Sequence, residues 1–316
     1  MRRVLVTGGA GFLGSRVTAL LAAHPEVDVV VSADLRETEV PGVVSATVDV
    51  TDPLSLPDVL ERHRIDSVVH LAAIVDPGRD AQADFRVDVL GSANVVAACV
   101  YAGVRRIVVA GSGAAYGYHP DNPEWIDETD PLRGNDDFPY ARHKRLIEEL
   151  LAAARSTHPE LEQVVFRIGT ILGPSVQNQI TRLWDRRRVL RIAGADSPFV
   201  FVWVDDVASA MVRAAIGDGP AGIYNVAGDG ALSVPEIARR MRKRLLTVPA
   251  PVLALALGLG RVLRVGAHGP EKIRFLRYRP ALRNDRLKDE FGYLPRYTSA
   301  EAFDEYLRAH PQIVQP

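Results

Sequence analysis

The chain has 316 residues, of which 47% are apolar and 24% charged, and these are the proportions of an ordinary globular protein. With 38 Lys and Arg residues against 39 Asp and Glu residues, overall charge favours neither nucleic acid nor a membrane surface as a partner. The single cysteine, Cys99, excludes an internal disulfide framework and a cysteine metal cluster, and suits a reducing cytoplasm. It lies in an apolar helical stretch and is expected in the core. The scattered histidines predict no metal site.

The chain opens with an apolar strand, Val4–Val6, a glycine-rich turn and an apolar-periodic helix over residues 15–23. Glycines at every third position let backbone N–H groups approach a pyrophosphate, whose charge the start of the helix stabilises. The sequence therefore predicts a dinucleotide site at this turn. Because the strand begins at the fourth residue, no signal peptide is expected, and the predicted location is cytoplasmic. The turn residues expected to hold the cofactor are Gly8, Gly11, Phe12, Leu13 and Gly14.

A second strand is predicted over residues 27–33, and it ends in Asp34 and Arg36. An acid about 20 residues past such a turn is placed to hold the ribose 2′-hydroxyl of a dinucleotide. Because its carboxylate repels a 2′-phosphate, Asp34 favours NAD over NADP. The guanidinium of Arg36 could tolerate that phosphate, so NADP stays open as the less favoured cofactor.

Strands and helices then alternate. Strands are predicted over residues 43–48, 67–70 and 106–110, with helices over 54–62 and 81–102 between them. The strands are apolar without clear alternation, which is typical of a parallel sheet buried on both faces. Leu71, Ala72 and Ala73 follow the strand at 67–70, where small residues leave room for a cofactor ring.

Two further stretches carry chemical groups. Ser112 comes just after the strand at 106–110, at the edge where open parallel sheets bind ligands. Tyr140 and Lys144 lie four residues apart at the start of a helix that continues to about residue 154, so they share one helix face. An ammonium group beside a phenol favours the phenolate. The three residues together predict a proton-transfer site.

At this point the chain resembles the extended short-chain dehydrogenase/reductase family, also called the NAD-dependent epimerase/dehydratase family. The resemblance covers nearly the whole chain, and its motifs are specific in combination. The matching residues are Thr7 to Gly14, Asp34, Asp49-Val50, His70 to Ala73, Ser112 with Tyr116-Gly117, Tyr140 with Lys144, Arg167 to Pro174, Val204 to Ala208, Tyr224 to Val226 and Leu287 to Thr298.

The resemblance implies a Rossmann-type, doubly wound α/β fold and hydride transfer with a nicotinamide cofactor. Tyr140 would be the general acid/base, Lys144 would favour its deprotonated form and hold the nicotinamide ribose, and Ser112 would hydrogen-bond the reacting oxygen. Asp34 would bind the adenosine ribose and Asp49 the adenine amino group. The full set expected to bind the cofactor is Gly8, Gly11, Phe12, Leu13, Gly14, Asp34, Arg36, Asp49, Val50, Leu71, Ala72, Ala73, Tyr140 and Lys144.

The second half of the chain is expected to move between two lobes. A sixth strand is predicted over residues 164–168, a helix near 180–188, a strand over 199–204 and a helix over 205–216 that starts at a capping aspartate, Asp205. The Asp205-Asp206 pair is interpreted as structural. Residues 1–168, with 199–217 returning to them, would form the cofactor domain, and 169–198 with 218–316 a smaller, substrate-binding lobe, helical after Tyr224. The apolar run Val248 to Leu263 is too short and interrupted to span a membrane, and a buried or substrate-lining helix is expected.

Departures from the family pattern bear on the substrate. Gly113-Ala114 stand where 4,6-dehydratases carry an Asp-Glu pair, which argues against dehydration. Thr170 and Phe199 stand where nucleotide-sugar enzymes commonly have Asn and Arg, and Asp88 replaces a common Asn. A diphosphate needs donors, and the chain offers aromatic residues instead. The residues predicted to contact the substrate are Ser112, Thr170, Phe199 and Trp203.

Three functions remain open. The favoured one is a reductase or dehydrogenase acting on a fairly apolar ketone or secondary alcohol. The second is a nucleotide-sugar epimerase that keeps NAD bound and uses Arg182, Arg187 or Arg191 for the diphosphate. The third is a binding protein without catalysis, which the presence of Tyr140 and Lys144 disfavours.

A homodimer is also a possible arrangement. In the family, the helices at about 81–102 and 139–156 often pair across a two-fold axis. An apolar stripe could serve that interface, although one face of this helix must pack on the sheet in any case. The stripe consists of Val89, Ala93, Val96, Ala97 and Val100.

Overall fold

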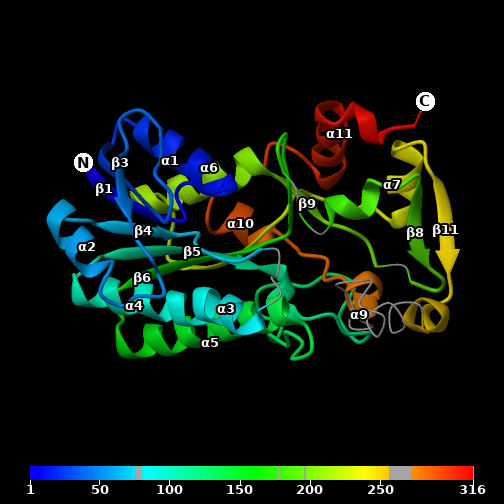
Figure 1. Ribbon diagram of the computed structural model, residues 1–316, viewed down its shortest axis with the longest axis horizontal. Coiled ribbons are helices and arrows are strands. Elements are labelled where there is room, and N and C mark those ends of the chain that lie inside the picture. Colours follow the sequence, from blue (N-terminus) through cyan, green and yellow to red (C-terminus); the bar gives the residue numbers. More distant parts are fainter. Residues whose placement is uncertain (76–79, 177, 179, 196, 256–271, 316) are drawn as a thin grey trace.

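The computed structural model describes residues 1–75, 80–176, 178, 180–195, 197–255 and 272–315. Its centre is a sheet of seven strands in the order β10-β6-β5-β4-β1-β2-β3 (Figure 1). Every pairing in it is parallel, and the order reverses on either side of β1, as in a doubly wound sheet. The strands are β1 (Arg2–Thr7), β2 (Val27–Asp34), β3 (Val44–Thr47), β4 (Ser67–His70), β5 (Arg106–Ser112), β6 (Glu162–Ile168) and β10 (Gly222–Val226).

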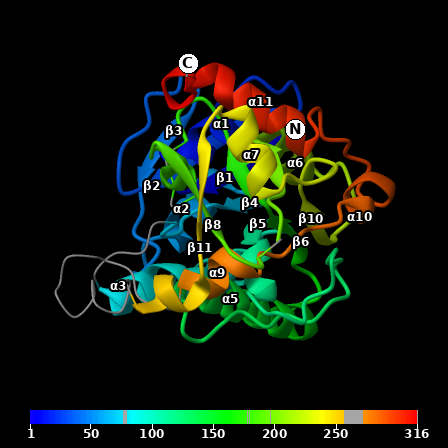
Figure 2. The same cartoon turned by 90° about the vertical axis from the view of Figure 1, so that its right-hand side faces the viewer.

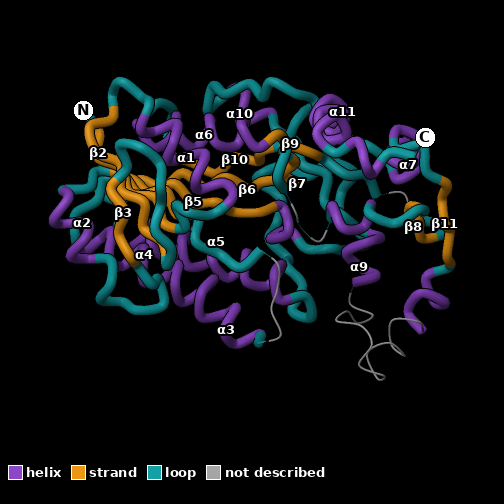
Figure 3. The backbone as a smooth tube through the Cα atoms, turned by 45° about the horizontal axis from the view of Figure 1, so that its top comes forward, coloured by secondary structure: helices purple, strands orange, loops and turns teal. Residues whose placement is uncertain are grey.

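Helices cover both faces of the sheet, which is why its strands are apolar throughout (Figures 1 and 3). One face packs against α1 (Phe12–Ala22), α6 (Val204–Ile216) and α10 (Asp285–Asp289). The other packs against α2 (Pro57–His63), α4 (Gly91–Tyr101) and α5 (Pro139–Thr157). The predicted Rossmann-type α/β fold is confirmed, and Cys99 lies buried in α4, as expected.

The predicted helix over 81–102 is interrupted. It begins as α3 (Ala81–Phe85), capped by Asp80, continues through a π-helical turn at Arg86–Leu90, and becomes α4. A π-helical turn inserts one extra residue into the helix, and such turns are frequent at functional sites. Here the turn contains Asp88, whose side chain is buried.

The second lobe lies beyond the end of the sheet at which the chain leaves β5 and β6 (Figures 1 and 2). It contains two short parallel pairs, β7 (Thr170–Leu172) with β9 (Phe201–Trp203) and β8 (Arg188–Ile192) with β11 (Arg244–Val248). Three helices pack around them: α7 (Val234–Arg240), α9 (Lys272–Arg277) and α11 (Ser299–Ala309). The lobe has its own core, in which Trp184 meets Phe199, Phe201 and Phe303 edge to face.

Several boundaries differ from the prediction. The helix expected near 180–188 is a 3₁₀ turn at Thr181–Trp184 followed by β8. Residues 222–226, assigned to the lobe, form β10 at the edge of the main sheet. The lobe after Tyr224 is also not purely helical, because β11 pairs with β8.

The start of α6 differs as well. Its N-cap is Trp203 rather than Asp205, which lies inside the first turn and pairs with Arg16. Asp206 accepts hydrogen bonds from the Tyr293 hydroxyl at 3.0 Å and the Arg296 N–H at 2.9 Å, so the interpretation of this acidic pair as structural is confirmed.

In the run Val248 to Leu263, residues 250–255 are helical, and the part from 256 onward lies outside the described residues. Among the described residues, no helix combines the length and the apolar character needed to cross a membrane.

Candidate active site

The glycine-rich turn connects β1 to α1 and has no room for side chains. Gly8 has φ +68°, and a β-carbon there would lie 2.8 Å from the Ala72 backbone nitrogen. A β-carbon on Gly14 would lie 2.0 Å from the Gly8 carbonyl oxygen. Gly11 is the N-cap of α1, so the free N–H groups of the first helical turn face the cavity described below. The backbone therefore fits a pyrophosphate, and a nicotinamide dinucleotide fits the residues present.

Asp34 ends β2 beside this turn. Its carboxylate accepts hydrogen bonds from the backbone N–H groups of Ala10 and Arg36, each at 3.1 Å. The Arg36 guanidinium lies 3.7 Å from the same carboxylate and donates to the Ala10 carbonyl at 3.0 Å. These contacts hold the Asp34 carboxylate beside the glycine turn, while the Arg36 side chain is 71% exposed.

The remaining residues predicted to bind the cofactor come from two loops. Asp49 is exposed and accepts from the backbone and hydroxyl of Thr51, and the Val50 carbonyl accepts from Asn94 at 2.9 Å. Leu71 and Ala73 line the cavity after β4, and the Ala72 backbone packs against the glycine turn. These loops leave the same edge of the sheet as the glycine turn.

The three predicted catalytic residues meet at the end of β5. Ser112 is the last residue of β5, caps the following 3₁₀ turn through Ala114 N–H at 3.2 Å and lines the cavity. Tyr140 and Lys144 lie on one face of α5, with the Lys144 ammonium 5.8 Å from the centre of the Tyr140 ring. Lys144 is buried and donates to the Ala110 carbonyl at 3.0 Å, which anchors its charge beside β5.

One cavity of about 520 Å³ joins the glycine turn to these three residues. It lies between the sheet domain and the lobe, and its walls are mostly aliphatic and aromatic. Besides the glycine turn and the three predicted catalytic residues, the residues that line it include Tyr118, Phe138, Thr170, Ile171, Val176, Ile180, Phe199, Val200, Phe275, Arg279 and Leu282.

A buried polar network supports the loop after β4. The Thr7 hydroxyl lies 2.7 Å from His70 Nδ1, and His70 Nε2 lies 2.9 Å from the Ser92 hydroxyl. Burial, with the nearby charge of Lys144, lowers the pKa of His70 to about 4. The imidazole is therefore neutral near neutral pH, and it aligns β1, β4 and α4 without adding a charge beside Lys144.

Asp88 links the catalytic helix to the same loop. One carboxylate oxygen accepts from the Ile74 backbone N–H at 2.7 Å, and the other lies 2.8 Å from His143 Nδ1. Asp88 and His143 are both buried, and His143 directly precedes Lys144. The substitution of the family's usual Asn at 88 therefore comes with a histidine partner on α5.

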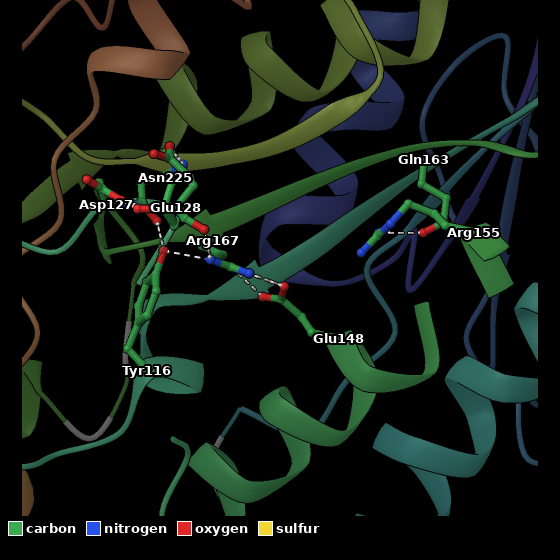
Figure 4. Close-up of polar contacts among 9 residues, drawn as sticks. Tyr116, Asp127, Glu128, Glu148, Arg155, Gln163, Arg167 and Asn225 are labelled. Atoms are coloured by element: carbon green, nitrogen blue, oxygen red, sulfur yellow. Dashed lines mark hydrogen bonds and ion pairs between the residues drawn. The ribbon is translucent and has the colours of Figure 1, made fainter. Parts of the chain in front are cut away.

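A second buried network lies between β6, α5 and β10 (Figure 4). Arg167 makes a bidentate ion pair with Glu148, with N···O distances of 2.8 and 2.7 Å, and donates to the Tyr116 hydroxyl at 2.8 Å. Tyr116 in turn donates to the Asn225 side chain at 2.8 Å, and the Asn225 backbone N–H donates to Glu128 at 2.6 Å. This network connects family-pattern residues, but its members lie outside the set that lines the cavity.

Among the residues predicted to contact the substrate, Ser112, Thr170 and Phe199 line the cavity and Trp203 does not. Trp203 packs against the Tyr297 ring and donates its indole N–H to Asp205, in the core of the lobe.

The arginines that the sequence suggested for binding a diphosphate do not line the cavity. In the described part of the chain, the arginine that lines the cavity is Arg279, rather than Arg182, Arg187 or Arg191. Sequence reasoning missed Arg279 and also Tyr118. Arg279 reaches the cavity through the docking of the lobe on the sheet domain, for which the sequence carries no local signal.

Comparison with known proteins places this geometry in context. The model of the NAD dependent epimerase/dehydratase family matches residues 4–227. An uncharacterized protein of Mycobacterium tuberculosis is 29% identical over 96% of this chain and 83% of its own length. A 2-alkyl-3-oxoalkanoate reductase of Stenotrophomonas maltophilia is 29% identical over 84% of this chain and 81% of its own length.

Among solved structures, MoeE5 in complex with UDP-glucuronic acid and NAD superposes with a TM-score of 0.76 at 26% identity. The superposition covers 98% of this chain and 99% of that one. The sheet domain and the lobe are therefore both shared with that structure.

Proposed function

This chain belongs to the NAD dependent epimerase/dehydratase family, and we propose that it is an NAD(P)-dependent oxidoreductase that acts reversibly on a ketone or secondary alcohol of a fairly apolar small molecule. The observation that carries the proposal is the single cavity that joins the glycine turn to Ser112, Tyr140 and Lys144 under mainly aliphatic and aromatic walls. Its size suits a small molecule beside the cofactor ring.

The residues divide between holding the cofactor and reacting. The glycine turn and the start of α1 would hold the pyrophosphate, Asp34 the adenosine ribose, Asp49 the adenine, and Lys144 the nicotinamide ribose. NAD, when bound, supplies the hydride acceptor or donor. Asp34 favours NAD over NADP, because its carboxylate would repel a 2′-phosphate.

The proton moves at the Tyr140 hydroxyl. In reduction, Tyr140 donates its proton to the substrate oxygen; in oxidation, its phenolate takes the proton from the substrate hydroxyl. Ser112 donates a hydrogen bond to the same oxygen and fixes its position. The Lys144 ammonium, held at the Ala110 carbonyl, stabilises the negative charge on Tyr140 during the exchange.

The test is Tyr140→Phe, which removes one oxygen from the site. Turnover should fall by about 10²–10⁴-fold, the usual contribution of a positioned acid/base, while NAD binding and thermal stability stay unchanged. Tyr101→Phe is the matched control, because Tyr101 is 73% exposed on α4 and does not line the cavity, so turnover and NAD binding should stay unchanged. Undiminished turnover in Tyr140→Phe would remove Tyr140 from the mechanism. If the wild-type protein binds NAD but turns over no substrate, a binding role without catalysis is favoured.

Asp34 and the UDP-glucuronic acid complex of MoeE5 favour a second candidate, a nucleotide-sugar epimerase. Such an enzyme regenerates its own cofactor and so keeps NAD bound. Native mass spectrometry of the purified protein separates the candidates: near-stoichiometric NAD indicates the epimerase, and reversible binding of added NAD(H) indicates the oxidoreductase.

We also propose that two copies pair through the outer faces of α4 and α5. Val89 and Val96 of the predicted stripe are buried in the core, but Ala97 and Tyr101 are exposed beside a shallow depression that Val100 and Leu150 also line. Ala97→Arg should therefore lower the sedimentation coefficient to that of a monomer. An unchanged coefficient would place any interface elsewhere.

A further inference from the structure

Arg279 follows α9 and projects into the cavity from the lobe. Its guanidinium lies 3.9 Å from the centre of the Phe199 ring. It donates to the carbonyl of Leu276 at 2.7 Å, to that of Pro198 at 3.4 Å, and to that of Ser197. These contacts fix the plane of the guanidinium over the ring and leave two of its five N–H groups without an acceptor among the described residues.

Among the residues that the structure describes, the charge of Arg279 has no carboxylate as a counterpart. Its acceptors are neutral carbonyls, and no carboxylate in the described part of the chain lies within ion-pair distance of it. Burial lowers the pKa of Arg279 to about 9. A partly buried cation without a charged partner is still costly, and an anionic ligand would remove that cost.

Tyr118 stands beside Arg279 in the cavity wall. Its ring is fixed edge to face between Phe138 at 5.4 Å and Phe275 at 5.3 Å. Burial, with the nearby Tyr140, raises the pKa of Tyr118, so its hydroxyl keeps its proton and is a donor. No described group accepts a hydrogen bond from that hydroxyl.

We infer that Arg279 and Tyr118 bind a carboxylate of the substrate, whose reacting oxygen lies at Ser112 and Tyr140. This inference rests on the proposed function and narrows its substrate to oxo acids and hydroxy acids with an apolar body. Two free guanidinium N–H groups and one phenol match the two oxygens of a carboxylate. A diphosphate needs more donors, and the described lining offers no second arginine.

Binding of a simple carboxylate tests the inference without turnover. We would titrate the NAD-loaded full-length protein with octanoate and with octanamide, its neutral counterpart, by calorimetry. Wild type should bind octanoate at least about 10-fold more tightly. Arg279→Gln should weaken octanoate binding by about 10–100-fold, the range for a hydrogen-bonded charge, and leave octanamide within about 3-fold. Tyr118→Phe should weaken octanoate by about 3–10-fold.

Arg283→Gln is the matched control, because Arg283 is exposed in the same segment and does not line the cavity. The melting temperature and the fluorescence of bound NADH show whether each variant is folded. If Arg279→Gln fails to fold, the test uses Tyr118→Phe and Arg279→Lys instead. Arg279→Lys keeps the positive charge and should keep the preference for octanoate over octanamide. Equal affinity of wild type for the two probes overturns the inference. Tight, Arg279-dependent binding of UDP with no octanoate binding also overturns it.

Turnover separates this inference from the proposed function. The paired substrates are 3-hydroxydecanoate and its methyl ester, with NAD as oxidant. The carbon that bears the hydroxyl loses a hydride to NAD, the hydroxyl oxygen loses its proton to the Tyr140 phenolate, and the 3-oxo compound forms. If wild type oxidises the acid with a lower KM than the methyl ester, and Arg279→Gln raises the KM for the acid to that of the ester, both the oxidoreductase and the carboxylate site are supported. Oxidation of acid and ester alike, unchanged in Arg279→Gln, overturns the carboxylate site and leaves the oxidoreductase intact. Arg279-dependent octanoate binding with no oxidation of either compound supports the site and counts against the oxidoreductase.

Discussion

Arg167 is buried and pairs with Glu148, whereas Arg279 is partly buried and has no carboxylate within ion-pair distance among the described residues. At Arg167, burial alone would lower the pKa, yet the hydrogen bonds and charge of Glu148 raise it above the ordinary arginine value. At Arg279, where the acceptors are carbonyls, burial lowers the pKa to about 9. The same side chain is thus satisfied in one region and left unsatisfied in the other.

The difference separates structure from function. The network around Arg167 ties β6 to α5 and β10 and is complete without a ligand (Figure 4). Arg279 faces the cavity, and its remaining N–H groups have no described acceptor. A paired buried arginine therefore reports how the fold holds together, whereas an unpaired one at a cavity reports what the cavity binds.

The largest effect is expected from Arg167→Met. This change leaves the Glu148 carboxylate buried without a partner, which costs about 3–5 kcal/mol of unfolding free energy. Arg279→Met leaves no buried carboxylate behind and should cost about 1 kcal/mol, because the loss of the hydrogen bonds to carbonyls and of the stacking on Phe199 is partly offset by removal of an unpaired charge. Urea denaturation of both variants measures the difference directly.

A double variant sharpens this result. Arg167→Met combined with Glu148→Leu removes both charges and should recover most of the lost stability, because apolar replacement of a whole ion pair is often neutral. If the double variant is as unstable as Arg167→Met, the hydrogen bonds to Tyr116, and not the charge of Glu148, dominate the network.

His70 provides an intermediate case, a buried base with neutral partners that can lose its charge. Its pKa is lowered from 6.5 to about 4, so the unfolded chain takes up the proton first as pH falls. The contribution of His70 is complete above about pH 6.5 and is lost as pH falls toward 4. It amounts to about 2 kcal/mol between pH 7 and 5. The measurement is the unfolding free energy at these two pH values.

His70→Asn is the comparison for this prediction. This substitution keeps a neutral hydrogen-bonding side chain between Thr7 and Ser92. Whatever its effect on stability at pH 7, the unfolding free energy of the variant should fall less steeply with decreasing pH than that of wild type. Parallel pH profiles for wild type and His70→Asn would show that other groups cause the acid sensitivity.

Much of the site follows from local rules. The ends of parallel strands meet at one edge of a sheet, and residues four apart share a helix face, so Ser112, Tyr140 and Lys144 could be assembled from spacing alone. The glycine turn and Asp34 follow from the first strand–turn–helix unit. The layers of the sheet domain were predicted for the same reason, since they follow from hydrophobic periodicity.

The structure of the lobe could not be predicted from local sequence patterns. The sequence predicts a helix near 180–188, yet this stretch ends in a strand, Arg188–Ile192, because these residues pair with residues 244–248, far along the chain. Strand formation depends on such partners more than on local preference. Arg279 reaches the cavity through the same tertiary packing. The sequence shows that Phe199 stands where nucleotide-sugar enzymes commonly have an arginine. Only the structure shows that Arg279, from a distant part of the chain, stacks on this phenylalanine.

The smallest effect concerns a third arginine, Arg36, which is exposed and 3.7 Å from the Asp34 carboxylate. Such an exposed pair contributes little to stability, about 0–1 kcal/mol, so its importance lies in the choice of cofactor. Asp34→Ser removes the group expected to hold the ribose 2′-hydroxyl and frees Arg36 for a 2′-phosphate. The KM for NAD should rise by about 10-fold and that for NADP should fall.

Arg36→Ala separates the two contributions in this cofactor choice. With Asp34 present, it should leave the KM for NAD nearly unchanged, because the carboxylate keeps its hydrogen bonds from the Ala10 and Arg36 backbone N–H groups. Added to Asp34→Ser, it should abolish the gain with NADP, because the phosphate then has no guanidinium. If Asp34→Ser alone leaves the NAD to NADP ratio at its original value, the Asp34 carboxylate does not select the cofactor. Arg36 would then be an exposed arginine without a role, the opposite of both Arg167 and Arg279.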